Sequence, residues 1–297
     1  MQVPQFLSRR TLTIAITLAG VLSLAIGAHA ALSLRALDAA KAIATQDDGP
    51  VSNRHTSRIA LVIGNGHYPD ATAPLGQPIN DARALTATLR RSGFDVDVVE
   101  DASKDDMTRA VARLKSRIRP DSVVMLFFGG YGVQVGRESY MIPVDAAIWK
   151  ESDVRRDGMS IESVLDAMKE QGACAKLVVV DASRRNPYER RFRTFSHGLA
   201  PISAPDNALI LTSATPGQVA DDSNGQHSVL MSELLANLNS LNAGESNKAL
   251  ADRAAAAEAI FNKTRIAISR ASDGAQVPSV SSSLLEDVRF GVANAGG

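Results

Sequence analysis

Two short apolar runs, rich in β-branched residues, constrain the fold of this chain more than any other feature. One covers residues 123–128 (VVMLFF) and ends in Gly-Gly-Tyr131; the other covers residues 177–180 (LVVV) and ends in Asp-Ala-Ser183. Short runs that are apolar at every position are typical of parallel strands buried on both faces. In open α/β sheets ligands bind outside the carboxyl ends of the strands, so we expect Tyr131 and Ser183 to face one crevice.

Strand and helix patterns alternate along the rest of the chain. Further strands are expected at residues 58–65, 94–100 and 208–213, with short edge segments at 140–144 and 287–290. Helices are expected from an Asn80-Asp81 cap to Gly93, from a Ser103 cap to Ile118, and over residues 160–169, 228–238 and 248–268. Repeated strand–helix–strand units predict an α/β sandwich: a mainly parallel sheet of about six strands with helices on both faces.

The N-terminus predicts export. Arg9 and Arg10 precede an uncharged apolar stretch over residues 11–27, and Ala-His-Ala at 28–30 has the pattern of a cleavage site, so residues 1–30 are interpreted as a signal peptide. The route can be secretory or twin-arginine, and an uncleaved anchor is a third option, although the run is short against the ~20 residues of a spanning helix. All three predict a periplasmic or secreted protein. Residues 31–57 are interpreted as a linker, 58–291 as one domain and 292–297 as a tail.

Composition excludes several classes of function. The formal net charge is zero, so nothing indicates bulk attraction to nucleic acid. Cys174 is the only cysteine, which excludes an intramolecular disulfide and a cysteine-based metal site, and we expect it to be packed as a small apolar residue. No cofactor or metal is predicted.

Separated blocks in a fixed order resemble the caspase-like peptidase family (peptidase C14), in particular bacterial relatives of metacaspases and paracaspases of the orthocaspase type. The blocks lie between Arg58 and Phe290, and they are 60–65 (ALVIGN), 80–82 (NDA), 132–134 with 140–145 (GVQ, YMIPVD), 181–187 (DASRRNP), 198–200 (GLA), 213–218 (SATPGQ), and 276–278 with 281–284 (QVP, SSSL). The resemblance implies a caspase-like three-layer sandwich that carries the large and small segments in one chain.

The resemblance also implies a catalytic dyad with histidine at the position of Tyr131 and cysteine at that of Ser183. A phenol with a pKa of ~10 is a poor base at neutral pH, and a serine hydroxyl needs a positioned base that a thiol does not. The chain is therefore predicted to be a pseudoenzyme that does not cleave peptides. In the family the backbone amides at Gly132 and Ser183 would form the oxyanion hole, and they survive side-chain replacement.

Family members of this type bind Arg or Lys of a substrate between two acidic residues, which match Asp81 and Asp181. Paired carboxylates suit a guanidinium. The alternative is that Asp81 caps a helix and Asp181 is satisfied by backbone donors. The predicted partners are basic peptide segments of other proteins or an active caspase-like relative, in a regulatory or scaffold role. A membrane is a partner only if the signal is uncleaved, and nucleic acid is not one.

Two other classes of function stay open. A weak hydrolase would use Ser183 as nucleophile, with His67, His197 or, best placed, His227 as base. A structural partner would instead use a basic loop, whose arginines are 184, 185, 190, 191 and 193. The oligomeric state and the natural partner are not predicted.

Overall fold

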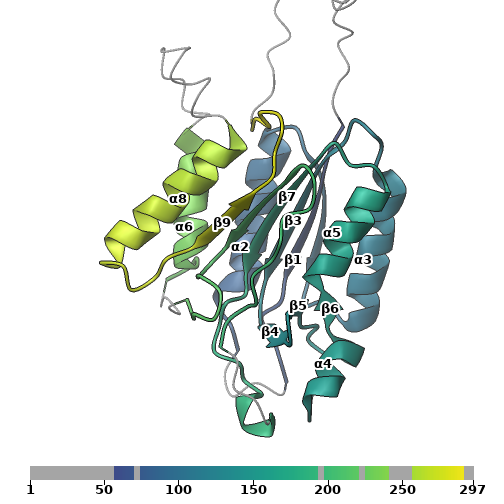
Figure 1. Ribbon diagram of the computed structural model, residues 1–297, viewed down its shortest axis with the longest axis vertical. Helices are drawn as coiled ribbons and strands as arrows, with labels where there is room; N and C mark the ends of the chain where they lie inside the picture. Colours follow the sequence, from purple (N-terminus) through teal and green to yellow (C-terminus); the bar gives the residue numbers. More distant parts are fainter. Residues whose placement is uncertain (1–56, 70–73, 193–196, 221–224, 241–255, 291–297) are drawn as a thin grey trace, which may run out of the picture. The chain divides into compact units, whose positions relative to one another are not determined.

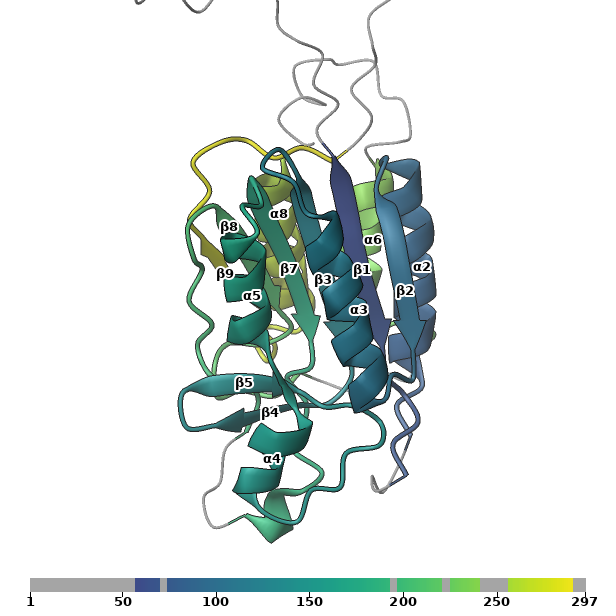
Figure 2. The same ribbon diagram turned by 90° about the vertical axis from the view of Figure 1, so that its right-hand side faces the viewer.

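A computed structural model describes residues 57–69, 74–192, 197–220, 225–240 and 256–290, shown from two sides in Figures 1 and 2. The predicted signal peptide (1–30), nearly all of the predicted linker (31–57) and the tail (292–297) lie outside the described residues. Residues 248–255, the first part of the helix expected over 248–268, lie outside them as well. Those interpretations stay predictions.

The main sheet has six strands in the order β2-β1-β3-β7-β8-β9. Five are parallel and β9 pairs antiparallel with β8 at the edge. Their bounds are β1 Arg58–Gly64, β2 Asp95–Glu100, β3 Val123–Gly129, β7 Ala175–Asp181, β8 Ala208–Thr212 and β9 Ser279–Ser282. β3 and β7 are buried at every position, which is why both sequences are apolar along nearly their whole length.

Helices cover both faces of this sheet (Figure 1). One face carries α2 (Gln77–Arg91), α6 (Val229–Ser240) and α8 (Ala257–Ala271); the other carries α3 (Lys104–Arg117) and α5 (Ile161–Glu170). Neighbouring residues of β3 point into different cores: Phe127 packs in the cluster with α2, α6 and α8, and Phe128 in the cluster with α3 and α5. The predicted α/β sandwich is confirmed.

A second, three-stranded sheet lies beyond the carboxyl ends of β1, β3 and β7 (Figure 2). It comprises β4 (Gly132–Val135), β5 (Glu138–Met141) and β6 (Met159–Ser160), all antiparallel. Helix α4 (Glu151–Asp157) and the 3-10 turn η1 (Glu189–Arg191) are the remaining elements among the described residues. The prediction of an edge strand over 140–144 is wrong, because the chain there belongs to this separate sheet and leaves it at Met141, before Pro143.

Helix α2 begins earlier than the sequence predicted. Its first residue is Gln77 with Pro78 next to it, so Asp81 lies inside the helix rather than at its cap. The helix packs tightly on the end of β1: a Cβ placed on Gly64 would lie 2.5 Å from the carbonyl oxygen of Pro78. Glycine is therefore required for α2 to bring Asp81 over the strand ends. The Ser103 cap of α3 is confirmed, with a reciprocal bond to Asp106.

Two smaller expectations are corrected. Residues 287–290 form no edge strand; the backbone of Arg289 forms an isolated β-bridge with Ala256, and the edge position is taken by β9. Cys174 is exposed rather than packed, because it lies in the turn that precedes β7.

Candidate functional site

Tyr131 and Ser183 follow two adjacent parallel strands, as predicted. Gly129 at the end of β3 is in register with Asp181 at the end of β7, so the two turns leave the sheet side by side. The amide of Gly130 donates to the carbonyl of Asp181 at 3.3 Å. Both side chains are buried, with 8 % of Tyr131 and 1 % of Ser183 exposed. The structure thus brings the two positions to one place and closes them to solvent.

The two amides expected to form an oxyanion hole donate within the protein. The N–H of Gly132 binds the carbonyl of Ala182 at 3.1 Å, and the N–H of Ser183 binds Oγ of Ser213 at 3.3 Å. In this arrangement both donors are engaged with internal acceptors. Their role as oxyanion donors stays a prediction, and it requires these bonds to open.

Tyr68, which sequence reasoning missed, supports the backbone of Tyr131. The two rings pack edge to face with centroids 4.9 Å apart. The Tyr68 hydroxyl accepts from the amide of Tyr131 at 3.1 Å and donates to the carbonyl of Ile142 at 3.0 Å. Burial raises the pKa of Tyr68 far above its usual range, so the phenol stays a neutral donor.

Asn65 holds the surrounding loops together. It is fully buried directly after β1, and its Nδ2 donates to the carbonyl of Ile142 at 3.1 Å while its Oδ1 accepts from the amide of Ala102 at 2.8 Å. The only sequence signal for this role is a polar residue that follows an apolar strand. The carbonyl of Ile142 therefore accepts from both Asn65 and Tyr68.

Asp81 and Asp181 are brought together at the carboxyl end of the sheet. Asp81 comes from α2, where its Oδ1 lies 2.8 Å from Nδ1 of His227 and its Oδ2 accepts from the amide of Ser228 at 3.3 Å. Burial, and next the charge of Asp181, raise the pKa of Asp81 to about 6, against the opposing effect of His227 and Ser228. The carboxylates are thus close enough to repel each other. We call this pair the acid pocket.

Arg184, the residue after Ser183, reaches the acid pocket. Arg184 turns back so that its Nη2 lies 3.7 Å from Oδ2 of Asp181, and both side chains are only 3 % exposed. That distance allows a charge interaction but exceeds a hydrogen bond. Three buried atoms nearby, Oδ2 of Asp181, Oγ of Ser183 and Nδ2 of Asn186, have no hydrogen-bond partner in the part of the chain that the structure describes.

None of the three candidate histidines, all of which lie within the described residues, is bonded to Oγ of Ser183. His67 is exposed and pairs with Asp101 at 2.6 Å, and His227 is bound to Asp81. His197 is exposed. Since Oγ of Ser183 accepts and donates no hydrogen bond among the described residues, no imidazole there is placed as its base.

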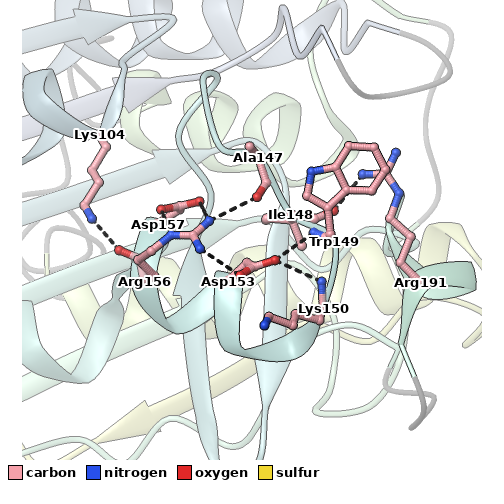
Figure 3. Close-up of polar contacts among 9 residues, drawn as sticks. All are labelled: Lys104, Ala147, Ile148, Trp149, Lys150, Asp153, Arg156, Asp157 and Arg191. Atoms are coloured by element: carbon pink, nitrogen blue, oxygen red, sulfur yellow. Dashed lines mark hydrogen bonds and ion pairs between the residues drawn. The ribbon is translucent and has the colours of Figure 1, made fainter.

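The basic loop is divided between buried, stacked and exposed arginines. Arg191 stacks on Trp149, with its guanidinium 4.5 Å from the ring centroid, and donates to the carbonyl of Ile148 at 2.6 Å (Figure 3). The Trp149 segment is in turn held by Asp153, whose Oδ2 accepts from the amide of Trp149 at 3.1 Å. Arg185 and Arg190 are exposed, and Arg193 lies outside the described residues.

No group of three or more His, Cys, Asp or Glu side chains among the described residues is arranged to hold a metal ion. Within the same residues, no helix is both long and apolar enough to cross a membrane.

Comparison with known proteins gives a consistent picture. The family model described as "Caspase domain" matches residues 57–289. Human mucosa-associated lymphoid tissue lymphoma translocation protein 1 is 28 % identical over 133 residues, and its mouse homolog is equally similar. The matched stretch is 44 % of this chain but 16 % of each of those proteins, so the likeness concerns a small part of the curated relatives.

Proposed function

The chain belongs to the caspase-domain family, whose model matches residues 57–289, and from this premise we propose that it is a pseudopeptidase that binds Arg- or Lys-containing segments of other proteins without cleaving them. Its role is regulatory or that of a scaffold, with an active caspase-like relative as one class of partner. The signal-like residues 1–30 support a periplasmic or secreted location.

One observation supports the proposal that the protein does not cleave peptides. Oγ of Ser183 is buried and has no hydrogen-bond partner among the described residues, while His227 is bound to Asp81. A serine hydroxyl without a base is a weak nucleophile. Tyr131 supplies no obvious substitute, because an unperturbed phenol, with a pKa of ~10, is a poor base at neutral pH.

Recognition of a basic side chain is supported by the acid pocket. Asp81 and Asp181 come from different elements and face the same place, and two carboxylates there oppose each other unless a cation joins them. Both are nearly inaccessible, with 0 % of Asp81 and 2 % of Asp181 exposed, so the pocket must open to admit a ligand. The rival structural role for the basic loop has less support, since Arg184 is buried and Arg191 is already stacked on Trp149.

The test combines turnover and binding. We expect no hydrolysis of fluorogenic peptides with Arg, Lys or Ala before the cleavable bond, either by the purified protein or by its Ser183→Ala variant. In fluorescence anisotropy, an Arg peptide should bind more tightly than its Ala counterpart, and Asp181→Asn should remove the difference.

Turnover that Ser183→Ala abolishes would instead establish a serine-dependent hydrolase. Binding that is unaffected by Asp181→Asn but lost in an Arg185→Gln/Arg190→Gln double variant would establish the basic loop as the contact surface.

A further inference from the structure

We propose that Arg184 is an internal ligand of the acid pocket, so that a basic peptide side chain can enter only by displacing it. This inference rests on the proposed function and adds to it a built-in competitor. It assigns to Arg184 the position at Asp181 that the guanidinium of a bound peptide would take.

The local backbone directs Arg184 into this position. The amide of Arg184 donates to the carbonyl of Ala182 at 2.8 Å, a three-residue turn that reverses the chain around Ser183. The side chain of Arg184 consequently folds back against the end of β7, where 3 % of it is exposed, whereas the next residue, Arg185, is exposed. Two adjacent arginines of the same charge therefore have opposite environments.

The electrostatic surroundings fit a guanidinium inside the pocket. Besides lying 3.7 Å from Asp181, the guanidinium of Arg184 is near enough to the buried hydroxyl of Tyr68 for its charge to act on it, against the dominant effect of burial, which raises the pKa of Tyr68. Without Arg184, the two carboxylates that repel each other would keep the imidazole of His227, bound to Asp81, as the described neighbouring side chain. A buried charge of this kind requires a counter-charge.

The same geometry makes Arg184 displaceable. Its contact with Asp181 is 3.7 Å long, whereas a well-formed guanidinium–carboxylate bond is about 2.7–2.9 Å long. Oδ2 of Asp181 and Oγ of Ser183 are left without hydrogen bonds among the described residues, and such buried atoms favour any ligand that satisfies them. A peptide arginine that reaches Asp181 directly would form the hydrogen bond to Oδ2 of Asp181 that Arg184 does not form.

The experiment compares Arg184→Gln with Arg185→Gln, its exposed neighbour of equal charge. The probes are a fluorescent peptide with one arginine and the same peptide with citrulline, which has nearly the same shape but no charge. We expect Arg184→Gln to bind the arginine peptide about tenfold or more tightly than the unchanged protein does, because the competing closed state is removed. Arg185→Gln should leave the affinity unchanged, and citrulline should show no gain in either variant.

Equal affinities of the unchanged protein and Arg184→Gln would overturn the inference while leaving the proposed function intact. Absence of arginine-dependent binding in every variant would instead overturn the proposed function.

A double-mutant cycle provides the second measurement, because Arg184→Gln leaves a buried carboxylate and can prevent folding. Urea unfolding of Arg184→Gln, Asp181→Asn and the double variant should show strong non-additivity, with the double variant less destabilised than the sum of the two. If Arg184→Gln does not fold, folding of the double variant supports the internal pair. Additive losses, or a double variant that also fails to fold, would overturn it.

Discussion

Nδ1 of His227 lies 2.8 Å from Oδ1 of Asp81, so the histidine that was the best candidate base for Ser183 is bound to the acid pocket instead. The contact joins the segment directly before α6 to the second turn of α2. It also counteracts the unfavourable surroundings of Asp81, which is fully buried and repelled by Asp181. The unfavourable surroundings of the Asp81 carboxylate should make the unfolding free energy depend on pH.

Asp81 should make the folded state less stable as the pH rises. Folding raises its pKa from 3.8 to about 6, so the folded protein holds this proton more tightly than the unfolded chain. The penalty for ionisation is absent below about pH 4, grows between pH 4 and 6, and is complete above pH 6, at roughly 3 kcal/mol. Asp81→Asn has no such carboxyl group, so its unfolding free energy should lack this decline.

Urea unfolding at several pH values between 4 and 7 checks this expectation. Asp206→Asn is the control, because that carboxylate is 84 % exposed. Parallel profiles for Asp81→Asn and the unchanged protein would contradict the shifted pKa of Asp81.

Removal of the Ser183 hydroxyl should cost almost nothing in stability. The hydroxyl is buried and has no hydrogen bond among the described residues, so Ser183→Ala should change the unfolding free energy by less than about 0.5 kcal/mol or raise it. Ser139→Ala is the matched variant: that buried hydroxyl accepts from the amide of Ala200 at 3.0 Å, and its loss should cost about 1–3 kcal/mol. Equal losses in chemical denaturation would show that Ser183 is bonded in the native protein.

Addition of one methyl group at Gly64 should disturb the acid pocket. The new Cβ would lie 2.5 Å from the Pro78 carbonyl and 2.8 Å from Cβ of Ala82, so α2 must shift, at a cost of about 1–3 kcal/mol. Gly76→Ala provides the control, since nothing lies within 4 Å of its added Cβ and its φ is −75°. Thermal unfolding should separate the two, and a Gly64→Ala protein as stable as Gly76→Ala would refute the tight packing.

Loss of the Tyr68 hydroxyl should weaken the turn that carries Tyr131. Tyr68→Phe leaves the amide of Tyr131 without its acceptor and removes one donor to Ile142, so we expect a loss of about 1–3 kcal/mol. Tyr140→Phe removes a hydroxyl that binds the exposed carboxylate of Glu138, where water can replace it, and should cost less than about 1 kcal/mol. The reverse ranking of the two unfolding midpoints would contradict this account.

The fluorescence of Trp149 should report on the basic loop. It is the only tryptophan of the chain, it is 67 % exposed, and Arg191 covers one side of its ring. Arg191→Ala should uncover the ring, so acrylamide should quench its emission more efficiently, with a loss of stability of at most about 1 kcal/mol. Arg190→Ala, at the exposed neighbouring position, should leave quenching unchanged; the same quenching in all three proteins would refute the stacking.

The sheet was predictable because its central strands are buried on both faces, which requires apolar residues at nearly every position of β3 and β7. The same logic placed Tyr131 and Ser183 at neighbouring strand ends. The small sheet was missed because β4 and β5 have four residues each and β6 has two, too short for a clear alternation. The start of α2 was misplaced because Pro78 fits the first turn of a helix as well as it fits a preceding loop.

The partners of the site residues could not be predicted, because they come from distant segments. Tyr68 meets the amide of Tyr131 across 63 residues, and Asp81 meets His227 across 146. Spacing along a single sequence carries no signal for such contacts. The burial of Arg184 beside the exposed Arg185 is a tertiary effect of the same kind, since the two residues are chemically identical.

The turns at Tyr131 and Ser183 are held through their main chains. The carbonyl of Tyr131 accepts from the amide of Ile142 at 3.0 Å, and the carbonyl of Ser183 accepts from the amide of Ala220 at 2.7 Å. These hydrogen bonds use only backbone atoms, so they do not depend on which side chain the residue carries. A different side chain at either place can therefore be accommodated while the backbone keeps its course, so the shape of this edge of the sheet does not depend on the chemistry that the two side chains carry.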